Sequence, residues 1–140
     1  MRVVGIDYGE ARIGIAVSDM TGTIAGASKV LKRSGSEKRD IAKLAEIIRE
    51  YNGVGEVVVG LPKTLRGEIG VQAEKVMRFV SMLEKNLDIP VRTWDERMTT
   101  SAAEKVLIDA GMSRGKRRAV IDKSAAAYML QGYLDAGNKK

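Results

Sequence analysis

The order of strand-like and helix-like segments is the feature of this sequence that most restricts its fold. Three strand-like segments come first, and turn residues separate them. They are Val3–Ile6, Arg12–Ser18 and Thr23–Leu31. Because no helical periodicity intervenes between them, they predict a run of three antiparallel strands at the start of a sheet.

Helical and strand-like segments alternate after this run. Ser36 precedes an amphipathic segment that Asn52-Gly53 ends, which predicts a first helix. Glu56–Gly60 is apolar on both faces, as in a buried parallel strand. A second helix follows Gly70, with a predicted apolar stripe of Ala73, Val76, Met77, Val80, Leu83 and Leu87. The remaining predicted elements are a strand at Pro90–Trp94, a helix from Ser101 to Gly111 and a final helix from about Ile121 to Ala136, followed by a frayed tail.

Together these segments predict an α/β fold with a mixed five-stranded sheet. Three antiparallel strands are followed by β/α units, and helices flank the sheet. This is the order of elements in a ribonuclease H-like fold. A chain of 140 residues usually forms one domain, and the sequence shows no repeat or linker. We therefore expect residues 1–140 to form a single domain.

Two missing residue types limit the chemistry that this chain can perform. It has no Cys and no His, which excludes a thiol nucleophile, a Cys-bound zinc ion and a Ser-His-Asp triad. The polar catalysts of an enzyme of this composition are carboxylates, Lys, Tyr or hydroxyls, and a hard cation bound by oxygen is the expected metal. No apolar run approaches the roughly 20 residues of a membrane span, and residues 1–9 lack the pattern of a signal peptide. We therefore expect a cytoplasmic protein.

Acidic residues follow two predicted strands and begin the last predicted helix. Asp7 ends the first strand, Asp95 and Glu96 end the last strand, and Asp122 begins the final helix. Sites in open α/β sheets form at the carboxyl ends of strands, so these residues could meet at one edge. Mg²⁺ or Mn²⁺ would remove their mutual repulsion and could activate water for phosphodiester cleavage.

Each acid also has a structural interpretation. Asp7 could hydrogen-bond its own turn, Asp95 and Glu96 could be a solvated pair, and Asp122 could cap the last helix. Asp95 and Glu96 are adjacent, so they point to opposite sides if the strand continues. At most one of these two carboxylates would then face a metal ion.

The positive charge of the chain is unevenly placed. Lys and Arg number 24 against 18 Asp and Glu, a formal net charge of +6. Four cations fall within residues 113–118, and a fifth follows; they are Arg114, Lys116, Arg117, Arg118 and Lys123. Such a segment can contact phosphates without regard to sequence, or it can be a solvated run of charge. Its position beside Asp122 favours the phosphate-binding interpretation.

A second basic segment lies between a predicted strand and the helix that follows it. Residues 63–70 combine Lys63 and Arg66 with glycines, at a junction where backbone N–H groups can meet an anion. Without further context, the interpretation as an ordinary connection is favoured. Trp94 is interpreted as a core residue or a plug at the strand end, and stacking on a base is its alternative.

Four motifs in register resemble a known family. They are Asp7-Tyr8-Gly9 with Arg12–Ala16, Val59–Pro62 with Gly67, Gly70, Gln72-Ala73 and Val76, Asp95–Thr100, and Arg117–Ala126 with Leu130–Leu134. The family is YqgF (RuvX), bacterial proteins similar to Holliday junction resolvases and also described as pre-16S rRNA nucleases. The resemblance covers nearly the whole chain.

The resemblance implies a ribonuclease H-like fold and a nuclease site that depends on Mg²⁺ or Mn²⁺. It carries the three acidic roles onto Asp7, Glu96 and Asp122, and leaves Asp95 as an alternate ligand. Structured RNA, or branched DNA, would be the nucleic-acid partner of a monomer or homodimer. The candidate phosphate-binding residues are Arg12, Lys63, Arg66, Arg97, Arg114, Lys116, Arg117, Arg118 and Lys123.

Several functions remain open at this point. The first is a nuclease acting on the 5′ end of pre-16S rRNA, in ribosome biogenesis. The second is a Holliday junction resolvase, which needs two active sites and hence a dimer. The third is a non-catalytic RNA-binding module. Asp7-x-Gly9 also resembles the phosphate loop of actin-like and Hsp70-like ATPases, but those proteins need two such domains.

Overall fold

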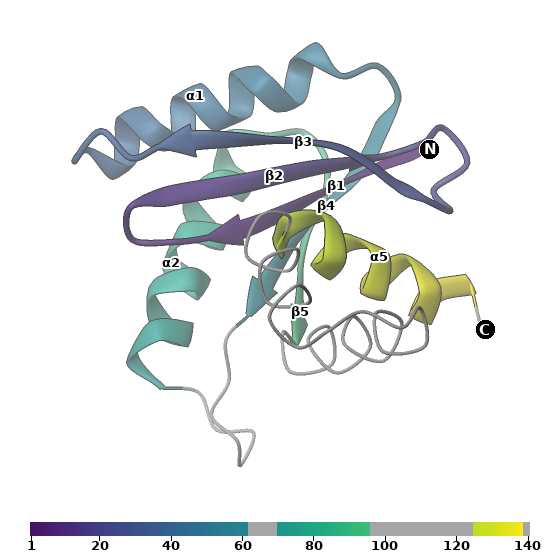
Figure 1. Ribbon diagram of the computed structural model, residues 1–140. Coiled ribbons are helices and arrows are strands. Elements are labelled where there is room, and N and C mark those ends of the chain that lie inside the picture. Colours follow the sequence, from purple (N-terminus) through teal and green to yellow (C-terminus); the bar gives the residue numbers. More distant parts are fainter. Residues whose placement is uncertain (62–69, 96–124, 139–140) are drawn as a thin grey trace.

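The structure is a computed structural model that describes residues 1–61, 70–95 and 125–138. Three strands come first and β/α units follow, as predicted (Figure 1). The predicted helix at residues 101–111 and the predicted start of the last helix lie outside the described residues. The described elements are β1 (Arg2–Tyr8), β2 (Arg12–Ser18), β3 (Ala25–Lys32), α1 (Glu37–Glu50), β4 (Val54–Leu61), α2 (Val71–Lys85), β5 (Val91–Asp95) and α5 (Ala125–Asn138).

The strands form one five-stranded mixed sheet in the order β3-β2-β1-β4-β5. β1 pairs antiparallel with β2, and β2 pairs antiparallel with β3. β4 runs parallel to both β1 and β5. These pairings confirm the predicted α/β class and the mixed sheet. They also make β1 the central strand and bring the carboxyl ends of β1, β4 and β5 to the same edge.

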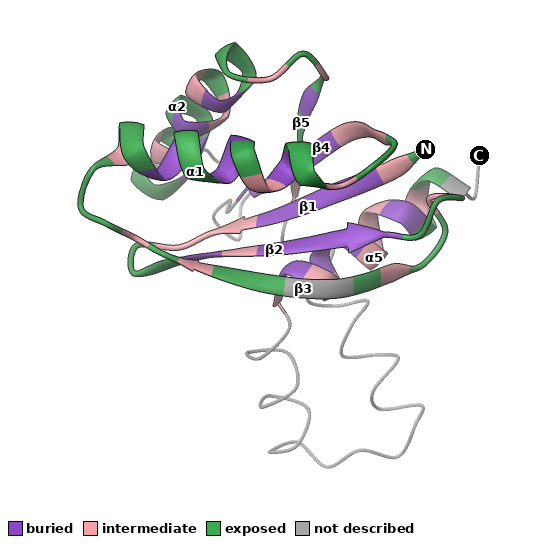
Figure 2. Ribbon diagram, turned by 90° about the horizontal axis from the view of Figure 1, so that it is seen from above, coloured by how far each residue is buried: buried purple, intermediate pink, exposed green. Residues whose placement is uncertain are grey.

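Helices cover both faces of the sheet, with α1 and α2 on one side and α5 on the other (Figures 1 and 2). Strand alternation divides the core accordingly. Val4 and Ile6 of β1 belong to the apolar cluster of α1 and α2, whereas Val3 packs with α5. The alternation therefore assigns each residue of β1 to one of the two helical layers.

Two glycines let α5 approach the sheet closely. A Cβ atom at Gly5 would lie 2.8 Å from the Cβ of Leu130, and one at Gly14 would lie 3.3 Å from the Cβ of Ala126. Both glycines lie on the central pair β1 and β2. The N-terminal half of α5 consequently lies directly on β1, which carries Asp7, and on β2, which carries its pairing partner Gly14.

The start of α1 agrees with the sequence. Ser36 is the N-cap, and its Oγ accepts a hydrogen bond from the Arg39 amide at 3.3 Å. Gly53 follows the helix with φ +76°, a backbone conformation that glycine adopts without strain. The predicted stop at Asn52-Gly53 is therefore confirmed.

Three details differ from the sequence prediction. The third strand starts at Ala25 because the amides of Thr23 and Ile24 bind the Asp19 carboxylate instead of continuing the ladder. In α2 the predicted stripe is wrong at Met77, which is 47% exposed, while Phe79 is fully buried and its ring lies 4.5 Å from that of Tyr8. The last helix includes residues 137 and 138, which the sequence assigned to a frayed tail. Within residues 1–61, 70–95 and 125–138, no helix has the length and apolar character needed to cross a membrane.

Candidate functional site

Asp7 lies near the carboxyl end of the central strand, on the side of the sheet that faces α5. Its neighbours Ile6 and Tyr8 both pack with the cluster of α1 and α2, so alternation directs Asp7 to the opposite face. Asp7 pairs with Gly14 of β2. A Cβ atom added to Gly14 would lie 3.6 Å from the Cβ of Asp7 and 3.3 Å from the Cβ of Ala126, so Gly14 lies between Asp7 and α5. Asp7 is half-buried at this position. Asp7 therefore lies where the end of β1 meets the first described turn of α5.

The structure does not support the interpretation of Asp7 as a turn residue. Among the described residues, no backbone amide or side chain donates a hydrogen bond to its carboxylate. The β1–β2 turn is held in another way. A Cβ at Gly9 would lie 2.5 Å from the Arg12 carbonyl oxygen, so the tight turn requires glycine there. The motif around Asp7 thus combines a tight turn with a carboxylate that accepts no hydrogen bond from the described residues of that turn.

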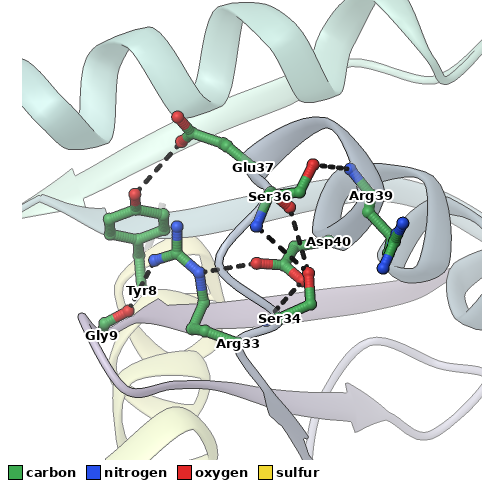
Figure 3. Close-up of polar contacts among 8 residues, drawn as sticks. All are labelled: Tyr8, Gly9, Arg33, Ser34, Ser36, Glu37, Arg39 and Asp40. Carbon is green, nitrogen blue, oxygen red and sulfur yellow. Dashed lines mark hydrogen bonds and ion pairs between the residues drawn. The ribbon is translucent and has the colours of Figure 1, made fainter.

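An arginine from the end of β3 holds this turn (Figure 3). The Arg33 guanidinium donates to the Gly9 carbonyl at 2.9 Å, and its backbone amide donates to the Ala11 carbonyl at 3.1 Å. Arg33 also pairs with Asp40 of α1, with 2.9 Å between Nε and Oδ2. The sequence pattern does not reveal these contacts, because they depend on how β3 and α1 meet the turn.

The Arg33–Asp40 pair is largely buried, with side chains 17% and 4% exposed. Burial alone would lower the pKa of the Arg33 guanidinium, but its hydrogen bond to Asp40 and its contact with Tyr8 outweigh that effect and raise the pKa. Burial would raise the pKa of Asp40, but hydrogen bonds from Ser34 and Arg33 lower it below its usual value. Both groups are therefore charged at neutral pH.

Two cations lie on the same face as Asp7, at the same end of the sheet. Ile13 and Ile15 pack with α1 and α2, so alternation directs Arg12 to the face of α5. Arg12 pairs with Lys32 of β3, and both side chains are exposed. Directly opposed like charges repel, and a bound anion would relieve that repulsion. Arg12 was a predicted phosphate contact, whereas Lys32 was missed because only the strand register places it opposite Arg12.

Asp95 reaches the same edge of the sheet as Asp7 but lies on the other face. It pairs with Leu61 at the end of β4. The preceding residue, Trp94, packs with the cluster of α5, and its ring meets that of Tyr133 edge-on at 5.5 Å. Alternation therefore directs Asp95 toward the side of α1 and α2. Trp94 is therefore half-buried against α5, consistent with a core residue or a plug at the strand end, and Asp95 faces away from Asp7.

Most of the other predicted site residues lie outside the described residues. In the part of the chain that is described, no group of three acidic residues comes together as a metal site. The donor chemistry of Asp7 nevertheless fits Mg²⁺ or Mn²⁺, which take carboxylate oxygens, because this half-buried carboxylate is not engaged by the described backbone. The predicted residues outside the description are Lys63, Arg66, Glu96, Arg97, Arg114, Lys116, Arg117, Arg118, Asp122 and Lys123.

A cleft of about 650 Å³ lies over the start of β1 and β4 and extends to Trp94 near the end of β5. Arg2, Glu56 and Arg92 line it, together with the rings of Trp94 and Tyr133. Glu56 accepts from the Tyr133 hydroxyl at 3.0 Å and pairs with Arg92 at 2.9 Å. Burial and the hydrogen bond to Glu56 raise the pKa of Tyr133. Arg2 and Asp7 are five residues apart on β1, about 17 Å, so the part of the cleft around Arg2 is distant from Asp7.

The protein has a ribonuclease H-like fold. Its sheet is mixed, Asp7 lies on the central strand β1, and α5 packs closely on β1 and β2. The solved structure of Thermus thermophilus RuvC in complex with a Holliday junction substrate has the same fold, with a TM-score of 0.59 and 20% identity, over 97% of this chain and 94% of that chain.

The sequence relationship is closer with a particular family. The family model described as "RuvX: Holliday junction resolvase" matches residues 1–136. A relative from Desulforamulus reducens is 50% identical over 139 residues, covering 99% of this chain and all of the relative. One from Thermoanaerobacter pseudethanolicus is 50% identical over 141 residues, covering both chains completely. Both bear the name "Putative pre-16S rRNA nuclease". The chain belongs to the RuvX family.

Proposed function

We propose that this protein is a divalent-metal-dependent nuclease that hydrolyses phosphodiester bonds at the 5′ end of pre-16S rRNA. The observation that carries the proposal is the position of Asp7. It is a half-buried carboxylate at the carboxyl end of the central strand, opposite Gly14 and next to the first described turn of α5. Full-length relatives at 50% identity that are named as pre-16S rRNA nucleases support the choice of reaction.

Glu96 and Asp122 are the proposed partners of Asp7. Strand alternation directs Trp94 to the face of α5 and Asp95 away from it, which favours Glu96 over Asp95 as the second ligand. Asp122 precedes Ala126 by four residues. The Cβ atoms of Ala126 and Asp7 both lie next to Gly14. If the helix extends back by one turn, Asp122 and Ala126 share a face.

The three carboxylates would bind the metal ion and hold it against the reacting phosphate. Mg²⁺ or Mn²⁺ supplies an activated water nucleophile and stabilises the oxygen that leaves, which requires no imidazole. Asp7 is half-buried, which limits access of bulk water to it. Carboxylate chemistry of this kind agrees with a chain that lacks His and Cys.

The cations would bind the substrate backbone around this acidic centre. Arg12 and Lys32 are exposed on the face of Asp7, about two residues along the ladder from Gly14. Phosphate contacts from such residues fix the position of a nucleic acid without reading its bases. We propose the same role for Lys63, Arg66, Arg97, Arg114, Lys116, Arg117, Arg118 and Lys123.

The proposed biological setting follows from the substrate. Processing of pre-16S rRNA belongs to ribosome biogenesis in the cytoplasm, which agrees with the expected location of the protein. We propose that residues 1–140 form one nuclease domain, because the relatives that cover the full chain have the same length.

The test is incubation of the pure protein with a precursor rRNA that carries its 5′ leader, in Mn²⁺ or in EDTA. Wild type should cleave the leader in Mn²⁺ and should not cleave it in EDTA. Asp7→Asn should lower the cleavage rate at least about 100-fold. Removing a group that only supports a metal ligand costs up to about 100-fold, and removing a ligand itself should cost at least as much. The rate is measured from the appearance of the shortened RNA.

Asp19→Asn is the matched control, because Asp19 directly follows the next strand, β2, and the described partners of its carboxylate all belong to its own turn. Its cleavage rate at neutral pH should equal that of wild type. Equal rates for wild type and Asp7→Asn would contradict the assignment of the site. Salt-sensitive RNA binding without any metal-dependent cleavage would favour a binding module.

Junction resolution is the second candidate, and the likeness to RuvC bound to a Holliday junction favours it. Two active sites must then act together, so the active species would be a homodimer. A four-way DNA junction incubated beside the rRNA substrate tests this candidate. Paired cuts by a dimer, with an intact rRNA leader, would replace the first proposal. A monomer that is inactive on the junction would exclude resolution.

A further inference from the structure

The β1–β2 turn separates two residues of the proposed site, and Arg33 binds its backbone from outside, while Lys75 of α2 reaches only the exposed Glu10 side chain, at 3.7 Å. Asp7 precedes the turn and Arg12 follows it. Arg33 bonds to both Gly9 and Ala11, through its guanidinium at 2.9 Å and its backbone amide at 3.1 Å. These bonds fix the carbonyl groups at the two ends of the turn. The path of the chain between the acid and the cation therefore depends on where Arg33 sits.

Arg33 is itself fixed by the start of α1. Its Nε donates to Asp40 Oδ2 at 2.9 Å, and the Ser34 amide donates to the other carboxylate oxygen at 3.0 Å. Asp40 is only 4% exposed and lies in the first turn of α1, where a negative charge is favoured by the helix dipole. The carboxylate thus has a donor on each oxygen and little freedom to move.

The ring of Tyr8 completes the arrangement on the side of α2 (Figure 3). Its centroid lies 4.8 Å from the Arg33 guanidinium carbon and 4.5 Å from the centroid of Phe79. Its hydroxyl donates to Glu37 at 3.1 Å. Tyr8 directly follows Asp7, so contacts from β3, α1 and α2 all restrain the backbone beside the acid.

We propose that Arg33 is a positioning residue of the nuclease site, which holds the β1–β2 turn so that Asp7 and Arg12 keep a fixed separation. The inference rests on the proposed function and extends it to a residue that lies on the other face of the sheet from Asp7. Arg33 is 17% exposed and lies on the side of α1 and α2, so it acts through the turn and does not contact the substrate. Groups that orient metal ligands from behind typically change affinity or activity by about 10–100-fold.

Two variants of Arg33 and one control test the proposal. Arg33→Met keeps much of the apolar stem and removes every bond of the guanidinium. Arg33→Lys keeps the charge opposite Asp40 but lacks the planar fork that reaches both Asp40 and Gly9. Arg49→Met is the matched control, because Arg49 also donates to a backbone carbonyl of another element, Asn86 at 2.8 Å, at the far end of α1.

The expected result has a kinetic part and a structural part. Both Arg33 variants should lower kcat for RNA cleavage about 10–100-fold, with a smaller change in KM, at a temperature well below their unfolding transitions. Amide hydrogen exchange at residues 9–12 should be faster in both Arg33 variants. Arg49→Met should have wild-type kcat and wild-type exchange in that turn.

A purely structural role makes a different prediction. In that case the activity loss would follow the unfolded fraction and would disappear on cooling, which would overturn the proposal. Equal kcat for Arg33→Met, Arg33→Lys and Arg49→Met would overturn it as well. If wild type cleaves nothing in any metal, the proposed function fails, and the exchange measurement still decides whether Arg33 holds the turn.

Discussion

Asp7 and Asp19 occupy similar places in the sequence, each near the end of a strand in the first half of the sheet, but the structure uses them differently. The Asp19 carboxylate accepts hydrogen bonds from the Thr23 and Ile24 amides at 2.9 and 3.1 Å, and from the Thr21 hydroxyl. Asp7 receives no such bond from the described residues. A carboxylate that binds its own turn is structural, whereas one that the turn leaves unused can bind a ligand.

The turns that follow these two residues differ in the same way. The β2–β3 turn is stabilised locally, by contacts that span five residues or fewer from Asp19. The β1–β2 turn depends on Arg33, which is 24 residues from Gly9 in the chain, and on Asp40. We infer that the turn beside Asp7 owes its shape to tertiary packing, since the Asp7 carboxylate accepts no hydrogen bond from the described residues of that turn.

The largest expected effect on stability comes from the remote support of the β1–β2 turn. Asp40→Ala leaves the largely buried Arg33 without its partner, which should lower the free energy of unfolding by about 3 kcal/mol. Urea unfolding of wild type and variant measures the difference. Lys43→Ala is the control, because its pair with Glu46 is exposed on both sides and should contribute less than about 0.5 kcal/mol. A loss for Asp40→Ala as small as that of the control would remove the contrast between the turns.

A smaller, pH-dependent effect is expected from the local support of the β2–β3 turn. The Thr21 hydroxyl and the turn amides lower the pKa of Asp19 from 3.8 to about 2. A lowered folded pKa means that its stabilising contribution is complete above the unfolded pKa and is lost as the pH falls through about 2. The Tm of wild type should therefore fall more steeply than that of Asp19→Asn between about pH 4 and pH 2. Asp40 titrates in both proteins, so the difference isolates Asp19; parallel curves would contradict the assignment.

Features encoded by short-range patterns were predictable from the sequence. The three initial strands, the Ser36 cap, the stop at Gly53 and the buried run of β4 all depend on residues within one element or one turn. The position of Asp7 at a strand end was also predictable, because the apolar run stops there. The family motifs supplied the likeness that the comparisons then confirmed.

Features that depend on contacts between elements were not predictable. The Arg33–Asp40 pair requires β3 and α1 to meet at the β1–β2 turn, and Lys32 faces Arg12 only in the observed register. Phe79 replaces Met77 in the core because its ring packs on Tyr8, which no helical period reveals. The opposite facing of Asp7 and Asp95 likewise follows from the two apolar clusters and not from their spacing.

The central claim is that the carboxyl end of β1 binds a divalent cation while the opposite end of the sheet does not. Paramagnetic broadening of backbone amide signals during a Mn²⁺ titration tests this directly. Signals of Gly14 and Ala126, which flank Asp7, should broaden first, while those of Gly22 and Gly55 at the opposite end stay sharp. Asp7→Asn should abolish the selective broadening. Broadening that begins at Gly22 beside Asp19, or that persists unchanged in Asp7→Asn, would contradict the account.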